Sequence, residues 1–220
     1  MRAPGLVIFD CDGVLVDSEP ISMRVLTDAI GAVGVPMPLE EVHATFVGTD
    51  FATIEREVSR RRGAPVPDGW MDEFYAVRAE VFERELRPIA GARAAVEGVR
   101  ADGWETCVAS QGRPAKMEQT LGLTGLSDLF AAQRIFSATM VERPKPAPDL
   151  FLYAARSCGW EPGECVVVED SLLGIRGARA AGMRVLGYLP AGAPEDAALP
   201  LLAAGAEVVR SLDEVPGRVA

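Results

Sequence analysis

The sequence predicts an α/β protein with a Rossmann-like parallel sheet core and an inserted all-helical domain. Short apolar runs alternate with segments of helical periodicity over most of the chain, which is typical of a parallel sheet with helices on both faces. The first apolar run lies almost at the N-terminus, and the segments after it lack strand alternation until about residue 86. We therefore expect a core built from residues 1–17 and 87–220, with residues 18–86 as the helical insertion.

The elements of the first half follow from local patterns. Leu6–Phe9 is an unbroken β-favouring run, which suits a central strand buried on both faces. Ser18 is expected to cap a helix that has Pro20 in its first turn and runs to about Gly31. The other helices of the insertion are expected over residues 39–46, 51–62 and 69–86, because prolines and glycines punctuate the segments between them.

Beyond residue 87 the expected elements alternate between helix and strand. Helices are predicted over residues 92–101 and 116–121, from the opening stretch 146–149 to about Cys158, and again after Asp170, and strands over residues 105–109, 133–137, 164–168, 183–189 and 206–209. In an open α/β sheet, ligands bind in the crevice at the carboxyl ends of the strands. Polar residues that directly follow the strands are therefore the first candidates for a functional site.

The composition restricts the class of partner. The chain has 220 residues and a net charge of −10. This charge argues against nucleic acid or an anionic membrane as partner, because both select for clustered lysine and arginine. A small phosphorylated molecule is compatible with it if a cation or a few placed basic groups offset the repulsion. We expect a monomer, with a dimer as the open alternative.

The sequence also predicts a cytoplasmic protein. No secretory segment precedes the first strand, and no apolar run approaches membrane length. The four cysteines show no CxxC spacing. Free thiols in a reducing compartment are therefore expected rather than disulfides.

Asp10 and Asp12 follow the first expected strand and are followed in turn by Gly13. A calcium-binding loop with Gly13 at its sixth position would put Ile8, inside the strand, at the first ligand position, so that alternative fails. A carboxylate pair at a strand end suits phosphoryl transfer. In this reaction Asp10 would attack phosphorus, and Asp12 would protonate the leaving oxygen and then activate water.

Further candidates follow later strands or precede helices. Ser110 and the backbone N–H groups after it, beginning at Gln111, are candidates to hold a phosphoryl oxygen, with a plain helix N-cap as the alternative for Ser110. Lys145 lies between two prolines, and such rigidity suits a lysine that neutralises phosphate and carboxylate, the alternative being an exposed loop lysine. Arg113 and Lys116 are candidates to contact the distal part of a substrate.

Glu169 and Asp170 end another apolar strand and add carboxylate oxygens. Acidic groups beside a phosphate dianion would repel it, so a divalent cation is implied. Mg²⁺ suits oxygen ligands, and we expect it near Asp10, Asp12, Glu169 and Asp170.

The order of these groups along the whole chain resembles the haloacid dehalogenase superfamily of phosphotransferases. Its four motifs match Asp10 with Asp12, Ser110, Lys145, and Glu169 with Asp170. The resemblance implies a helical cap after the first motif, as in the subfamily of β-phosphoglucomutase and phosphoglycolate phosphatase. It also implies a Mg²⁺-dependent reaction through an aspartyl-phosphate, with the metal held by the Asp10 side chain, the Asp12 backbone carbonyl and Asp170.

Within this superfamily, Asp12 favours phosphoryl transfer over dehalogenation. The mutases carry a histidine in the first cap helix and an arginine in the substrate loop, but residues 20–24 contain no histidine and residues 48–51 no arginine. We expect a phosphatase of a sugar phosphate or a sugar-acid phosphate such as 6-phosphogluconate. The alternatives left open are a phosphoglycolate phosphatase, a phosphosugar mutase and a non-catalytic protein that binds phosphorylated metabolites.

Overall fold

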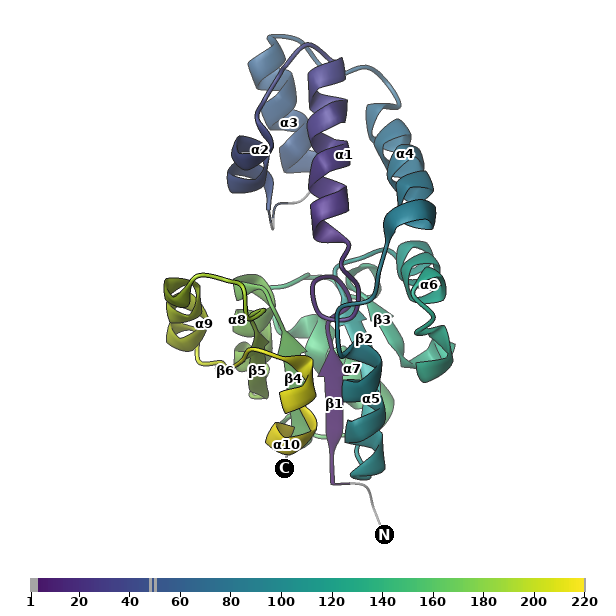
Figure 1. Cartoon of the computed structure of the whole chain (residues 1–220), viewed down its shortest axis with the longest axis vertical. Helices are drawn as coiled ribbons and strands as arrows, with labels where there is room; N and C mark the ends of the chain where they lie inside the picture. The colour runs from purple at the N-terminus through teal and green to yellow at the C-terminus, as the bar shows by residue number, and fades with distance from the viewer. Residues whose placement is uncertain (1–3, 48, 50, 220) are drawn as a thin grey trace. The chain divides into compact units, whose positions relative to one another are not determined.

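The computed structural model describes residues 4–47, 49 and 51–219, and the chain divides into two compact units. The helices in the described residues of the helical unit, Ser18–Leu86, are α1 (Glu19–Ala32), α2 (Leu39–Phe46), α3 (Phe51–Arg62) and α4 (Trp70–Glu85) (Figure 1). Val25, Leu26 and Ile30 form the buried face of α1, and Trp70 donates a hydrogen bond from its indole to the carbonyl of Ala29, 3.1 Å away. Gly48 and Asp50, in the segment compared with the mutase loop, lie outside the described residues.

The second unit, Met1–Asp17 with Arg87–Ala220, contains a six-stranded parallel sheet in the order β3-β2-β1-β4-β5-β6. Its strands are β1 (Leu6–Phe9), β2 (Glu105–Ser110), β3 (Ile135–Ser137), β4 (Cys165–Glu169), β5 (Arg184–Tyr188) and β6 (Glu207–Val209). Its helices are α5 (Ala92–Ala101), α6 (Pro114–Leu123), α7 (Asp149–Cys158), α8 (Leu172–Ala180), α9 (Ala198–Ala203) and α10 (Pro216–Val219). The expected parallel α/β fold is confirmed.

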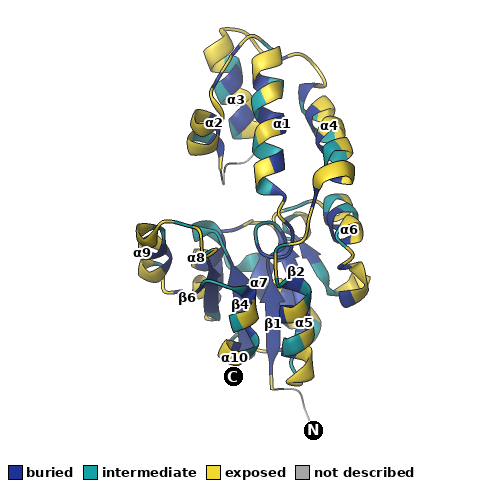
Figure 2. Cartoon of the chain, viewed as in Figure 1, coloured by how far each residue is buried: buried dark blue, intermediate teal, exposed yellow. Residues whose placement is uncertain are grey.

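The centre of the sheet is buried on both faces, as the apolar run of β1 predicted. Leu6 and Ile8 pack in one cluster with residues of α7 and α8, among them Phe151 and Ile175. The alternate residues of β1 point to the opposite face and are fully buried as well. Figure 2 shows this central part of the sheet in dark blue. Phe9 is level with Val108 of β2 and Val168 of β4, so the residues that follow these positions meet at one edge.

Several local expectations needed correction. Ser18 stands before α1 but makes no side-chain capping bond, because its backbone is helical (φ −92°, ψ −21°) rather than extended as capping requires. The third strand is shorter than expected, since residues 132–134 form a 3₁₀ turn. The short helices α9 and α10 were not predicted. All four cysteines lie in the described part of the chain and are free thiols, and none of the described helices is both long and apolar enough to cross a membrane.

Candidate active site

Asp10 is placed by the sheet itself. Its backbone N–H donates to the carbonyl of Val168 at 2.9 Å, which continues the pairing of β1 with β4 by one residue. The chain then turns, with the N–H groups of Leu15 and Val16 both donating to the carbonyl of Cys11 at 2.9 Å. Asp10 is therefore buried, 5% exposed, at the carboxyl edge of a central strand.

Lys145 is buried against this carboxylate, so it is not the exposed loop lysine of the alternative interpretation. Its side chain is 1% exposed, and its Nζ donates to Asp10 Oδ1 at 2.5 Å and to Glu169 Oε1 at 2.9 Å. A third bond runs to the carbonyl of Ala109 at 3.1 Å. The Phe151 ring lies beneath the ammonium group, with its centroid 4.9 Å away, which adds a cation–π contact. One cation thus links the ends of β1, β2 and β4.

The burial of these charges shifts their proton affinities. Burial is the largest cause that raises the pKa of Asp10, from an ordinary value of 3.8 to about 7; Lys145 opposes the shift, and Glu169 and Asp12 add to it by repulsion. Burial alone would lower the pKa of Lys145, but attraction to Asp10 and Glu169 outweighs it and raises the pKa. The ammonium group therefore stays charged at neutral pH.

Glu169 is held on both of its oxygens. Oε1 accepts from Lys145, while Oε2 accepts from the backbone N–H of Ser171 at 2.8 Å and from its hydroxyl at 2.9 Å. The Ser171 hydroxyl also accepts from the N–H of Gly174 at 3.0 Å and so caps α8. The start of α8 and the Glu169 carboxylate are thereby joined in one hydrogen-bonded group.

We expect Gly174→Ala to reduce kcat by roughly 10-fold or more, because a methyl group there would lie 2.0 Å from the carboxyl carbon of Glu169 and would displace the carboxylate that supports Lys145. A fall of about 1–3 kcal/mol in the free energy of unfolding should accompany it. Steady-state kinetics and thermal unfolding provide the two measurements. Gly122→Ala on α6 is the matched control, since nothing lies within 4 Å of the added methyl group; equal effects of both substitutions would contradict the prediction.

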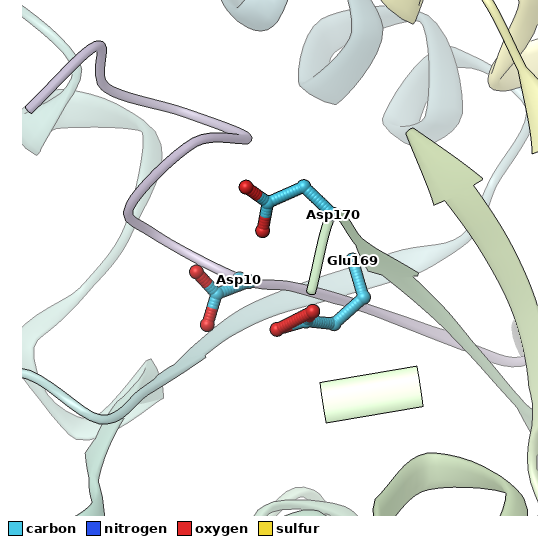
Figure 3. Close-up of side chains that lie close together, drawn as sticks. All are labelled: Asp10, Glu169 and Asp170. Atoms are coloured by element: carbon cyan, nitrogen blue, oxygen red, sulfur yellow. The ribbon is translucent and has the colours of Figure 1, made fainter. Parts of the chain in front are cut away.

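Asp170 completes an acidic cluster that fits a hard divalent cation. Asp10, Glu169 and Asp170 each offer an oxygen within 4.8 Å of the others, and the three side chains converge beyond the ends of β1 and β4 (Figure 3). Gly13 is required beside them: its φ is +81°, and a methyl group there would lie 2.0 Å from Asp170 Oδ2. Carboxylate oxygens are the ligands that Mg²⁺ prefers, so the donor set suits this ion.

The loop after β2 brings Ser110 to the same edge. Ser110 is the last residue of its strand and α6 begins only at Pro114, so the plain N-cap interpretation of Ser110 is wrong. Its hydroxyl accepts from the N–H of Gly112 at 3.0 Å and lies 3.4 Å from Asp12 Oδ2. The exposed Gln111 bonds to the backbone of Lys145 through both ends of its amide, at 3.3 and 3.5 Å. The loop after β2 and the Lys145 loop are therefore tied together.

The two remaining candidates lie near this loop. Lys116 forms an ion pair of 2.5 Å with Asp12 Oδ1, and Arg113 is exposed at the N-cap position of α6. The structure thus brings together Asp10, Asp12, Ser110, Lys145, Glu169 and Asp170 with Lys116 beside them. Sequence reasoning missed Ser171 and the role of Gly174. Ser171 stands three residues before Gly174, the spacing that separates an N-cap from the third residue of its helix, and this spacing is the signal that could have identified them.

An α/β fold with carboxylates and a buried lysine at the carboxyl edge of its central strands defines a Rossmann-like enzyme. The family model described as haloacid dehalogenase-like hydrolase matches residues 4–182. The chain belongs to this family, and the resemblance noted from its motifs is confirmed.

Individual relatives agree with the family. The chain is 33% identical over 180 residues to the 6-phosphogluconate phosphatase of Escherichia coli (strain K12), which covers 81% of this chain and 80% of that protein. A solved haloacid dehalogenase-like protein of unknown function from Agrobacterium tumefaciens has 35% identity and a TM-score of 0.82, covering 97% of this chain and 96% of that one. A family hydrolase from Deinococcus radiodurans, solved with bound phosphate and sodium, has 31% identity and a TM-score of 0.79, covering 97% and 94%.

Proposed function

We propose that the protein is a Mg²⁺-dependent phosphatase of a phosphorylated sugar or sugar acid and acts through an aspartyl-phosphate on Asp10. The observation that carries this proposal is the buried pair of Asp10 and Lys145, with Nζ 2.5 Å from Oδ1. A lysine that supports a carboxylate at the carboxyl edge of a parallel sheet suits nucleophilic attack on phosphorus. The 6-phosphogluconate phosphatase relative supports the substrate class.

Each side chain has a separate task in this reaction. Asp10 attacks phosphorus while Asp12 gives its proton to the leaving oxygen, and Asp12 then takes a proton from the water that cleaves the aspartyl-phosphate. Ser110 and the N–H groups after it hold the phosphoryl oxygens, and Lys145 fixes Asp10. Mg²⁺, when held by Asp10, Asp170 and the Asp12 carbonyl, would offset the charge of the phosphate.

Glu169 has a different role in this proposal. Both of its oxygens already accept hydrogen bonds from Lys145 and Ser171, so it serves mainly to hold the lysine and contributes little to the cation. The helical unit, residues 18–86, would act as the cap that selects the substrate and excludes water. This role of the helical unit, the cytoplasmic location and the monomeric state stay predictions.

A panel of phosphate esters tests the proposal. Phosphorylated sugars, sugar acids and 2-phosphoglycolate are compared by kcat/KM in MgCl₂, with release of inorganic phosphate as the readout. We expect hydrolysis that falls by roughly 100-fold or more with EDTA and returns with added Mg²⁺. Isomerised rather than released phosphate would favour a mutase, and no turnover of any ester would leave a binding protein as the better interpretation.

A further inference from the structure

Asp12, the proton-transferring group of the proposed reaction, has a lysine partner to which that reaction gives no task. Lys116 Nζ lies 2.5 Å from Asp12 Oδ1, and the side chains of the two residues are 18% and 26% exposed. Ser110 Oγ lies 3.4 Å from the other oxygen of Asp12. The pair is partly shielded from water, so its attraction is screened less than that of an exposed ion pair.

The position of Lys116 is fixed by the helix that carries it. Met117, Thr120 and Leu121 bury one side of α6, and Thr120 Oγ1 lies 4.0 Å from Cys11 Sγ, next to Asp12 in the chain. A methyl group on Gly112 would lie 3.5 Å from Lys116 Cδ and 3.3 Å from Ser110 Oγ. The lysine stem therefore passes over the glycine of the loop after β2, and α6 contacts both this loop and Cys11, the residue before Asp12.

We propose that Lys116 is a positioning residue that holds the Asp12 carboxylate beside Ser110, where the leaving oxygen of a bound phosphate ester would lie. The inference rests on the proposed function and gives Lys116 a different task from the substrate contact expected from sequence. As the bond between Asp10 and phosphorus forms and the ester P–O bond breaks, the proton that Asp12 took from the attacking water of the preceding turnover passes to the leaving oxygen, and the carboxylate left on Asp12 is the form that pairs with Lys116. The attacking water later returns a proton to Asp12. Lys116 takes no part in the proton transfer and limits the rotamers of its partner.

The test is the dependence of kcat/KM on the pKa of the leaving group, which reports steps up to formation of the aspartyl-phosphate. A series of phosphate esters from p-nitrophenyl to alkyl is measured with the wild type and with Lys116→Met. Alkyl esters need the proton of Asp12, so we expect their kcat/KM to fall by roughly 10–100-fold. The p-nitrophenyl ester leaves readily without a proton and should change less than about 3-fold.

Three comparisons make the result specific. Arg156→Met removes a positive charge from an exposed position on α7. It should leave the dependence of kcat/KM on the pKa of the leaving group unchanged. In an Asp12→Asn background, Lys116→Met should cause no further fall in kcat/KM. If the methionine variant unfolds at a lower temperature than the wild type, Lys116→Gln is used to repeat the measurement. A uniform loss for all esters, with a matching rise in KM and in the inhibition constant of inorganic phosphate, would overturn the inference in favour of substrate contact. Lack of wild-type activity on p-nitrophenyl phosphate would instead count against the proposed function itself.

Discussion

Asp10→Asn is expected to lower kcat by roughly 10⁴-fold or more on every phosphate ester, because the amide cannot attack phosphorus. The substitution is nearly isosteric at a position that is 5% exposed, so the fold should be retained. Single-turnover and steady-state release of phosphate give the measurement. Asp17→Asn, the same chemical change at an exposed acid seven residues later, is the control. Retention of Mg²⁺-dependent turnover in Asp10→Asn would remove Asp10 as nucleophile.

The same variant has a second readout, the stability of the metal-free protein. Burial raises the pKa of Asp10 from 3.8 to about 7, so the folded state binds the proton more tightly than the unfolded state. The contribution of the protonated carboxyl to stability is fully present below pH 3.8 and is lost as pH rises through about 7. Asparagine stays neutral, so Asp10→Asn should be more stable than the wild type by about 1–3 kcal/mol at pH 8. The stability difference between Asp10→Asn and the wild type should vanish towards pH 4. A difference in Tm that does not depend on pH would show that the raised pKa of Asp10 is not its cause.

Lys145→Met is expected to have the largest effect on stability, about 3–5 kcal/mol of destabilisation at pH 8. The lysine is 1% exposed between two carboxylates, and its removal leaves their charges buried and unbalanced. Since Lys145 lowers the pKa of Asp10, that pKa should rise further in the variant, and the stability loss should grow as pH increases. Urea unfolding at pH 5 and pH 8 measures the difference, and kcat should fall by roughly 10³-fold.

Arg143→Met is the control that distinguishes the loss of the buried Lys145 from the loss of any positive charge in the same loop. Arg143 pairs with Asp149 at 2.8 Å, but its side chain is 68% exposed, and such surface pairs contribute little to stability. We expect it to change neither kcat nor the pH dependence of unfolding. A similar loss of stability in both variants would show that burial of Lys145 between carboxylates is not the cause.

Local patterns were sufficient to predict the core of the fold. The apolar run of Leu6–Phe9 favoured a central strand, because a central strand of a parallel sheet is buried on both faces. The boundaries of α2, α3 and α5 also followed from periodicity and punctuation. Ser18 and the third strand were less predictable, since capping and strand ends depend on backbone angles set by neighbouring elements.

The sequence by itself determined the chemistry of the candidate site: carboxylates after β1 and β4, a hydroxyl after β2 and a lysine between prolines. Which of these side chains meet was decided by the tertiary structure. Lys145 contacts Asp10 across 135 positions of the chain, and Lys116 reaches Asp12 rather than open solvent. Periodicity encodes which residues a single element buries, whereas such pairs depend on sheet register and on the close approach that Gly13 and Gly174 allow. Sheet register and close approach both depend on packing between distant segments, which short-range sequence patterns do not specify.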